Sequence, residues 1–346
     1  MKYIKGLDAL RALAVAVVVI GHSRFHLFYT DHGPVANIFH VFLPTDMFGV
    51  DVFFVLSGFL ITSILLHADN RNRPKIILLK NFVARRTLRI FPVYYLTLLI
   101  LWVIRYPDIR QYLAWFLTYT SNILCFKTHV WNAFSHTWSL SVEEQFYLIW
   151  PWFILFINKK YFKYLFAFFI LSGPVSSFIS MKIYNGIAPI LLPDCFDSFG
   201  IGGLYAYCFV SPERMKKFKN VLRFAFPIAL CIYLYWKLMP MTGVVGFGDG
   251  IFNRTINSII AIWLIDHVIN SKSGFWEIPI LNRIGKISYG IYLFHIPVSV
   301  IVNSLHISTS LYVIYAIKLP VLILISYCSY YFFELKVMAL KKRFTY

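Results

Sequence analysis

The stretch Asp8-Ala-Leu-Arg11-Ala-Leu-Ala-Val-Ala-Val-Val-Val-Ile-Gly-His22 is an apolar run bracketed by three polar side chains. An α-helix turns about 100° per residue, so Arg11 and His22 share one helix face, roughly 16 Å apart, and Asp8 can pair with Arg11. Ionisable residues in a membrane helix cost roughly 2.5–3.5 kcal/mol each and usually face the bundle interior, where they mark a site. The alternative is that Asp8 and Arg11 lie at one membrane interface and His22 at the other, without a further role.

The composition indicates a polytopic membrane protein. Of the 346 residues, 59% are hydrophobic and only 14% are charged, whereas a soluble domain carries about 25% charged residues. The net charge of +18 comes mostly from basic residues in short segments between apolar runs. That distribution is typical of cytoplasmic loops and argues against nucleic-acid binding. The five cysteines are scattered without a Cys-x-x-Cys motif, so they predict neither a disulfide framework nor a metal site.

Apolar segments of about the length that crosses a bilayer predict an all-α bundle of about ten transmembrane helices. Both termini are expected in the cytoplasm, because that orientation places most Lys and Arg residues on the inner side. A further segment at 112–126 is too short and too polar for a full span, and we expect a re-entrant or interfacial element there. We expect one membrane domain over 1–346 without an appended soluble domain. The predicted spans lie near 7–25, 47–66, 90–104, 138–157, 164–181, 196–210, 221–237, 251–269, 287–303 and 311–333.

An arginine cluster opens the third predicted span, in Ala84-Arg85-Arg86-Thr-Leu-Arg89-Ile-Phe-Pro92. Spacings of three and four residues allow a helix to direct Arg85 and Arg86 toward Arg89. Guanidinium groups bind phosphate oxygens bidentately, so the cluster fits a cytosolic ligand that carries several phosphates. It fits equally well an ordinary contact with lipid phosphates on the positive inner side.

Two adjacent glutamates enter the fourth predicted span, in Trp138-Ser-Leu-Ser-Val-Glu143-Glu144-Gln-Phe-Tyr147. Neighbouring helical residues point about 100° apart, so we expect one glutamate to face the bundle and the other the interface. An intramembrane Glu is costly unless it is paired, which favours a role for one of them. The alternative is the ordinary preference of acidic residues for helix starts.

Two further polar positions lie inside predicted spans. Asp51, in Gly49-Val-Asp51-Val-Phe-Phe-Val-Leu-Ser57, lies at a depth comparable to that of His22. Its carboxylate either orients that imidazole and increases its basicity or is a solvated helix-start residue. His295 lies about midway along the ninth span, where it is either functional or a hydrogen-bonded packing residue.

Five motifs in this order resemble the signature of the membrane acyltransferase-3 family of bacterial O-acyltransferases. The resemblance covers residues 3 to about 335 and implies a multi-pass enzyme. Such an enzyme transfers an acyl group, commonly acetyl, from cytosolic acyl-CoA to a hydroxyl of a glycan or glycolipid. The motifs are Asp8-x-x-Arg11 with His22, Gly49-Val-Asp51-Val-Phe-Phe-Val-Leu-Ser57-Gly58, Arg86-x-x-Arg89-Ile-x-Pro92, Trp138-Ser-Leu-Ser-Val-Glu143-Glu144-Gln-Phe-Tyr147 and Ser288-Tyr289-Gly-Ile-Tyr-Leu-Phe-His295.

Matched residue by residue, the resemblance makes His22 the catalytic histidine and Arg11 its functional partner. It implies that Arg86 and Arg89, which we extend to Arg85, bind the phosphates of CoA. Glu143 matches the glutamate of the family's fourth span, and we add Asp51 to the catalytic group for its depth near His22. Further candidates are Asp8, Ser57, Glu144, Tyr147, Ser288, Tyr289 and His295.

From the composition and this resemblance we expect a protein of the bacterial inner membrane, with acetyl-CoA or another acyl-CoA as donor, no metal, and membrane lipids and a glycan as partners. O-antigen, exopolysaccharide, a common enterobacterial-type antigen, peptidoglycan and small glycolipids are all compatible acceptors. Two other functions remain open: a transporter or flippase for an anionic glycolipid, and a non-catalytic membrane scaffold. Against the transporter, the sequence has no internal hydropathy symmetry.

Overall fold

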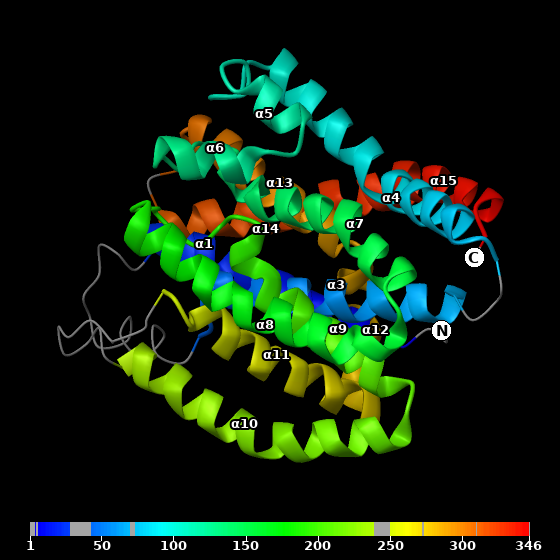
Figure 1. Cartoon of the computed structure of the whole chain (residues 1–346). Helices are drawn as coiled ribbons and strands as arrows, with labels where there is room; N and C mark the ends of the chain where they lie inside the picture. The colour runs from blue at the N-terminus through cyan, green and yellow to red at the C-terminus, as the bar shows by residue number, and fades with distance from the viewer. Residues whose placement is uncertain are drawn as a thin grey trace. The chain divides into compact units, whose positions relative to one another are not determined.

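The computed structural model of the protein describes residues 4, 6–27, 43–69, 73–238, 250–271, 273–308 and 310–345. Within these ranges every regular element is a helix and there is no strand, as the apolar segments predict (Figure 1). The α-helices are α1 Gly6–Leu27, α3 Asp46–Asp69, α4 Lys75–Val103, α5 Leu113–Leu117, α6 Ser121–Thr128, α7 Trp138–Phe156, α8 Phe162–Phe178, α9 Phe196–Phe209, α10 Pro212–Leu238, α11 Asn253–Asn270, α12 Pro279–Lys286, α13 Ser288–Ser304, α14 Leu311–Cys328 and α15 Leu335–Met338. Two π-helical turns, Ile179–Ile183 and Ser329–Glu334, continue α8 and α14, and the 3-10 turn Ala339–Arg343 follows α15.

A helix occupies each of the ten positions at which the sequence predicts a span. Five helical stretches in the described part of the chain are long and apolar enough to cross a membrane, or six if the consecutive helices α12 and α13 count as one. The protein is therefore a multi-pass membrane protein, and the number of ten spans stays a prediction. The five stretches are Asp46–Asp69, Lys75–Val103, Lys159–Ile183, Pro212–Leu238 and Val313–Arg343.

The segment 112–126 forms two short helices, α5 and α6, instead of one continuous span. Helix α5 ends at Leu117, and two residues later Tyr119 adopts the left-handed conformation with φ of 52°. The Thr120 N–H then donates to the carbonyl of Trp115 and closes the helix end. With five and eight residues, the two helices are about 7.5 and 12 Å long, too short to cross the hydrocarbon core. A re-entrant or interfacial position for them stays a prediction.

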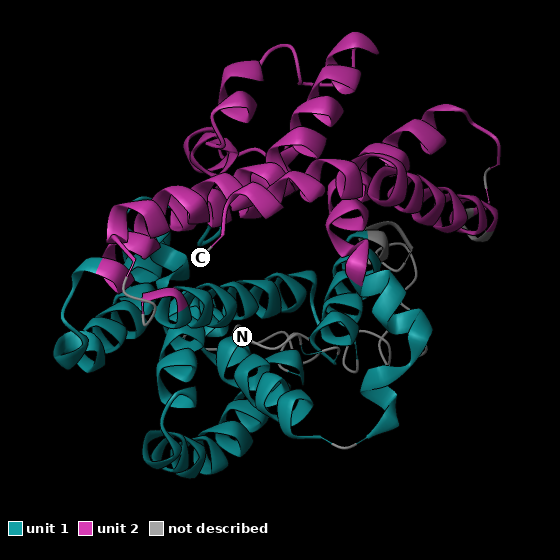
Figure 2. Cartoon of the chain, turned by 90° about the vertical axis from the view of Figure 1, so that its right-hand side faces the viewer, with its two compact units in different colours: residues 1–67, 156–285 teal, residues 68–155, 286–346 magenta. Residues whose placement is uncertain are grey.

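The chain folds into two compact units, each built from two separate stretches (Figure 2). Unit 1 consists of Met1–His67 and Phe156–Gly285, and unit 2 consists of Ala68–Leu155 and Lys286–Tyr346. The chain therefore passes from unit 1 to unit 2, returns to unit 1 and ends in unit 2, so each unit combines residues that are far apart in sequence. A single domain over 1–346 stays a prediction.

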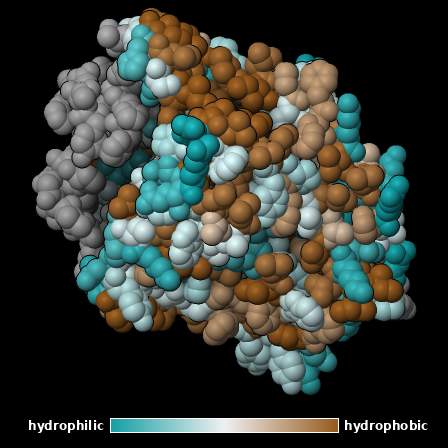
Figure 3. All heavy atoms as spheres, turned by 90° about the horizontal axis from the view of Figure 1, so that it is seen from above, coloured by the Kyte–Doolittle hydropathy of each residue, from teal (hydrophilic) through white to brown (hydrophobic). Residues whose placement is uncertain are grey.

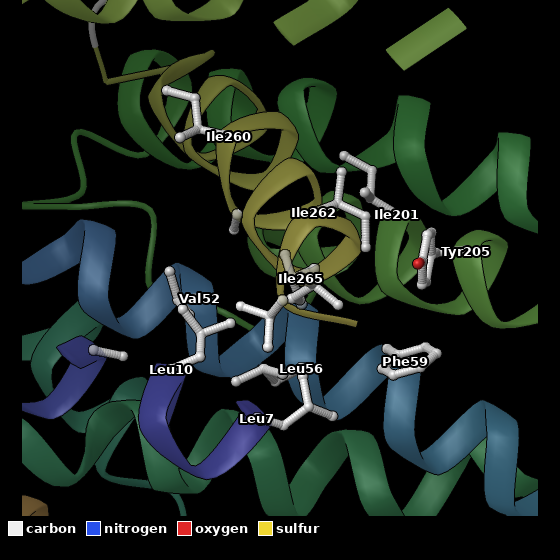
Figure 4. Packing of buried hydrophobic residues seen from close by; sticks show 14 of the residues in the cluster. Leu7, Leu10, Val52, Leu56, Phe59, Ile201, Tyr205, Ile260, Ile262 and Ile265 are labelled. Carbon is white, nitrogen blue, oxygen red and sulfur yellow. The ribbon is translucent and has the colours of Figure 1, made fainter. Parts of the chain in front are cut away.

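The core of unit 1 is a cluster of buried side chains from α1, α3, α9, α10 and α11 (Figure 4). Aliphatic residues dominate it, as expected for helices whose apolar faces meet, and Phe59 packs edge-on against Tyr205 with ring centroids 5.2 Å apart. This core fixes α1 against α3. It thereby also fixes the positions of the polar residues that both helices carry. The residues labelled in the figure are Leu7, Leu10, Val52, Leu56, Phe59, Ile201, Tyr205, Ile260, Ile262 and Ile265.

Gly49 allows α1 and α3 to approach closely. A Cβ atom built on Gly49 would lie 2.6 Å from the Ala14 carbonyl oxygen and 2.8 Å from a methyl group of Val18. Only a residue without a Cβ fits there without moving one of the helices. The glycine that opens the second motif is therefore a packing requirement that brings the two motif-bearing helices together.

Large apolar side chains also point outward from both units. Leu99 of α4, Phe168 of α8, Phe224 of α10 and Leu324 of α14 are each between 57% and 69% exposed. One face of the molecule shows broad hydrophobic patches between smaller polar ones (Figure 3). Because water would disfavour so much exposed apolar surface, these side chains fit a lipid environment.

Candidate active site

The N-terminal turn of α1 carries an ion pair. The Nη1 of Arg11 donates to the Oδ1 of Asp8 at 2.5 Å, and Asp8 is buried. The predicted pairing of these residues, three apart on one helix, is confirmed. Because the carboxylate lies beside the guanidinium, α1 carries this cation at a lower cost than an isolated one.

His22 lies near the other end of the same helix, in a geometry suited to a general base. Its Nδ1 is 3.0 Å from the carbonyl oxygen of Val18. A carbonyl only accepts hydrogen bonds, so Nδ1 carries the proton and Nε2 holds the lone pair of the neutral ring. Nε2 lies 3.8 Å from the Oδ2 of Asp46, the first residue of α3, and 30% of the imidazole side chain is exposed. If Nε2 takes up a proton, the positive charge of the ring therefore lies close to the Asp46 carboxylate.

Asp51 takes a position that differs from both sequence-based alternatives. It is neither solvated nor the carboxylate beside His22, because its oxygens accept hydrogen bonds from Arg254 Nη1 at 2.5 Å and Asn257 Nδ2 at 2.8 Å. The side chains of Asp51 and Arg254 are 3% and 5% exposed. Five helical residues turn about 500°, so Asp51 and Asp46 face directions about 140° apart on α3, and Asp46 is the one that reaches His22.

The Asp51–Arg254 pair belongs to a buried polar network in unit 1. Arg254 also donates from Nη2 to the carbonyl of Pro189 at 2.8 Å. On α9, the buried Asp197 accepts from the Thr255 hydroxyl at 2.5 Å. The network ties α3, α9 and α11 together through polar contacts within a mostly apolar interior. Ser57, the other polar candidate of this motif, lies partly buried on α3, one and a half turns after Asp51.

The sequence-based reasoning missed Asp46, Arg254 and Asn257. One signal pointed to Arg254: an arginine inside the predicted span 251–269 needs a partner, and Asp51 is a carboxylate inside another span. Asp46 had no comparable signal, because a carboxylate at the start of a helix is common.

In unit 2, the three arginines of α4 have different environments. Arg85 donates from Nη1 to the carbonyl oxygens of Lys341 and Phe344, at 3.0 Å each. This arginine therefore holds the last turn of the chain, whose carbonyls lack partners within a helix. Arg86 lies over the rings of Phe82 and Tyr147, with its Cζ 5.6 and 5.4 Å from their centroids.

Arg89 is exposed on α4, and Tyr147 is buried on α7. The contact of Tyr147 with Arg86 joins two of the predicted motifs, those of the third and the fourth spans. Such a cation–π arrangement fixes the guanidinium while leaving its N–H edge able to bind an anion. The two motifs are brought together within unit 2.

Glu144 is buried on α7, while Glu143 is partly exposed. Glu144 lies within electrostatic range of the Arg86 guanidinium. The two side chains thus diverge as helical geometry requires, and the inward one is Glu144, whereas the resemblance points to Glu143. The catalytic assignment of either glutamate stays a prediction.

Gln145, the residue after Glu144, fixes the segment between α5 and α6. Gln145 Nε2 donates to the Tyr119 carbonyl and to Asn122 Oδ1, at 3.0 Å each. The Tyr119 ring stacks on Tyr94 of α4, with centroids 4.3 Å apart. The fourth motif therefore positions a segment that the sequence only marks as apolar.

The last motif, on α13, provides packing contacts. The Tyr289 hydroxyl donates to the Ile90 carbonyl at 3.1 Å, and Ser288 is buried. His295 is buried, its Nδ1 lies 2.6 Å from the Tyr292 carbonyl, and its ring lies 4.9 Å from that of His136. These contacts fit the packing alternative for His295.

Comparisons with known proteins agree with the motifs. Peptidoglycan O-acetyltransferase OatA of Listeria monocytogenes is 30% identical over 326 residues, which cover 86% of this chain and 49% of the relative. Putative peptidoglycan O-acetyltransferase YrhL of Bacillus subtilis is 28% identical over 366 residues, which cover 96% and 54%. Putative O-acetyltransferase SACOL0978 of Staphylococcus aureus is 27% identical over 373 residues, which cover 96% and 57%. The chain spans about half the length of these relatives, and no solved structure matches it.

A family model described as an acyltransferase domain matches residues 4–332, and so includes both units. The match contains all five motifs, from Asp8 to His295. The chain therefore belongs to the membrane acyltransferase-3 family.

Proposed function

We propose that the protein transfers an acetyl group from cytosolic acetyl-CoA to a hydroxyl group of a cell-wall glycan. Peptidoglycan is the first acceptor to test, because two of the relatives are named peptidoglycan O-acetyltransferases. The observation that carries the proposal is the acyltransferase match over residues 4–332, which includes a histidine whose imidazole is 30% exposed and whose Nε2 lies 3.8 Å from a carboxylate oxygen.

In the proposed reaction, Nε2 of His22 takes the proton from the acceptor hydroxyl. The hydroxyl oxygen attacks the thioester carbonyl, a new C–O bond forms, the C–S bond breaks, and the CoA thiolate leaves and takes up the proton that the His22 imidazolium gives back. Asp46 stabilises the imidazolium that forms, since its carboxylate lies 3.8 Å from Nε2. Arg11, the functional partner that the family motif implies, is paired with Asp8 roughly 16 Å along the helix from His22, so its charge acts at a distance from the oxyanion and not by direct contact.

The donor would bind through its phosphates at α4. Arg86 is held by two aromatic rings, and Arg89 is exposed one turn further along the helix. Guanidinium groups bind phosphates bidentately, which suits a nucleotide donor with several phosphates.

The experiment reconstitutes the full chain in liposomes with [14C]acetyl-CoA and peptidoglycan fragments, and measures label in the glycan. We expect His22→Ala to reduce transfer by about 100-fold or more, the usual size of a general-base contribution. The matched control is His306→Ala, because His306 is exposed in the loop after α13 and belongs to none of the motifs. Transfer by His22→Ala at the wild-type rate would show that this histidine is not the base.

The same assay separates the other functions. A glycolipid transporter would move an unlabelled glycolipid across the liposome membrane without labelling it, and a scaffold would do neither. If His22 carries the acetyl group in a covalent intermediate, acid-quenched protein retains label, and His22→Ala abolishes that label. Unlabelled glycan in the presence of every acceptor fragment would contradict the proposed function.

A further inference from the structure

The last residues of the chain are held on the arginine-bearing part of α4. Thr345 accepts hydrogen bonds at its carbonyl from Arg73 Nη1 at 3.0 Å and from Asn81 Nδ2 at 2.6 Å. About one turn of α4 after Asn81, Arg85 donates to the carbonyl of Lys341. Residues 339–345, the C-terminal segment, thus run along the same stretch of α4 that carries the predicted phosphate-binding motif.

This arrangement brings another cation to the motif. Lys341 is partly buried, and its ammonium lies within electrostatic range of the guanidinium groups of Arg85, Arg86 and Arg89. The buried carboxylate of Glu334, which accepts from Ser329, is also within range of Arg89 and Lys341. Four cations and two carboxylates therefore gather at this end of unit 2, because Glu144 also lies within electrostatic range of Arg86.

Like charges that are partly withdrawn from water repel one another more strongly than they do in bulk solvent. The two carboxylates offset only two of the four positive charges, whereas a ligand with several phosphates interacts favourably with all of them. Arginine contributes fixed planar donors, and lysine adds a compact charge on a flexible stem that can follow a phosphate. The composition of the cluster therefore favours a polyanionic ligand.

We propose that Lys341 binds a phosphate of the acyl donor together with Arg86 and Arg89, and that the C-terminal segment forms one wall of the donor site. This inference rests on the proposed function, because it takes the polyanion to be acyl-CoA. The phosphates of anionic lipid headgroups share the same chemistry, and the experiment separates the two sources.

The experiment titrates the full chain in a neutral maltoside detergent with CoA, dephospho-CoA and pantetheine, and measures each dissociation constant by calorimetry. We expect Lys341→Gln to raise the Kd for CoA about tenfold and to leave binding of the phosphate-free pantetheine unchanged. Lys336→Gln is the matched control, since Lys336 is exposed on α15, outside the C-terminal segment. Lys341→Arg keeps the charge and is expected to retain most of the affinity.

An unchanged CoA titration in Lys341→Gln would overturn the inference alone. Equal losses for CoA and pantetheine would also overturn it, because they would show a general disturbance of the C-terminal segment. An effect of Lys341→Gln that appears only on binding of phosphatidylglycerol vesicles would assign the residue to lipid. If the wild-type protein binds no CoA, that result would instead contradict the proposed function, and this inference would fall with it.

Discussion

At the scale of single residues, the Asp51–Arg254 pair shows how unit 1 accommodates charge inside an apolar core. Both side chains are almost fully buried, and each has further polar partners, Asn257 for the carboxylate and the Pro189 carbonyl for the guanidinium. A buried ion pair contributes little net stability compared with a well-packed apolar pair, but removing one partner leaves an uncompensated charge. The pair is therefore expected to make unit 1 sensitive to single substitutions.

We predict that Arg254→Met destabilises the protein more than the double substitution Asp51→Leu with Arg254→Met. The single variant leaves a buried carboxylate alone, which typically costs about 3–5 kcal/mol, whereas the double variant replaces both charges with apolar groups. Thermal unfolding in detergent, followed by tryptophan fluorescence, measures the difference. Equal midpoints for the two variants would mean that the carboxylate tolerates the loss of Arg254.

The residue scale also shows what sequence alone predicts. The Asp8–Arg11 pair was predictable because its members are three residues apart on one helix, so local geometry decides the contact. The partner of Asp51 lies 203 residues away, and no local pattern specifies which of the intramembrane charges meet. The same limit applies to Lys341, whose approach to α4 depends on the path of the whole chain after α14.

At the scale of secondary-structure elements, helix positions follow from apolar runs, and a helix is present at each of the ten predicted places. The division of 112–126 into two helices was not predicted, because it depends on the left-handed Tyr119 and on Gln145 from another helix. Neither feature is visible in the apolarity of the segment. The close approach of α1 to α3, set by Gly49, likewise comes from contact between elements.

We predict that Gly49→Ala lowers both stability and acetyl transfer. The added methyl group meets the Ala14 backbone, and such overpacking typically costs about 1–3 kcal/mol. Because α1 carries His22, a shift of α1 from α3 also separates the imidazole from Asp46. Gly274→Ala is the control, since a Cβ there has no atom within 4 Å in the described structure. A Gly49→Ala protein with wild-type unfolding temperature and activity would contradict this packing role.

At the scale of the whole molecule, the ten-span arrangement with both termini in the cytoplasm can be tested by labelling. In a cysteine-free background, we expect Asn158→Cys and Ser273→Cys to be protected from a membrane-impermeant maleimide added to intact cells. The same reagent is expected to label Asn185→Cys and Ser304→Cys. The first two residues follow an even number of predicted spans and the last two an odd number. Labelling of Asn158→Cys from outside would require a different number of spans before it.

The ribosome makes Asp51 long before it makes Arg254. At about 5–20 residues per second, the 203 residues that separate them take on the order of 10 to 40 seconds to synthesise. During this interval the nascent helix α3 already carries its carboxylate while the matching cation does not yet exist. A lone carboxylate is poorly tolerated in hydrocarbon, so the insertion machinery has to shelter α3, or the carboxylate has to hold a proton, until α11 emerges. Until α11 is synthesised, α3 therefore needs either a polar partner from the insertion machinery or a neutral carboxylic acid at Asp51, and it gains its permanent counterion only when Arg254 arrives.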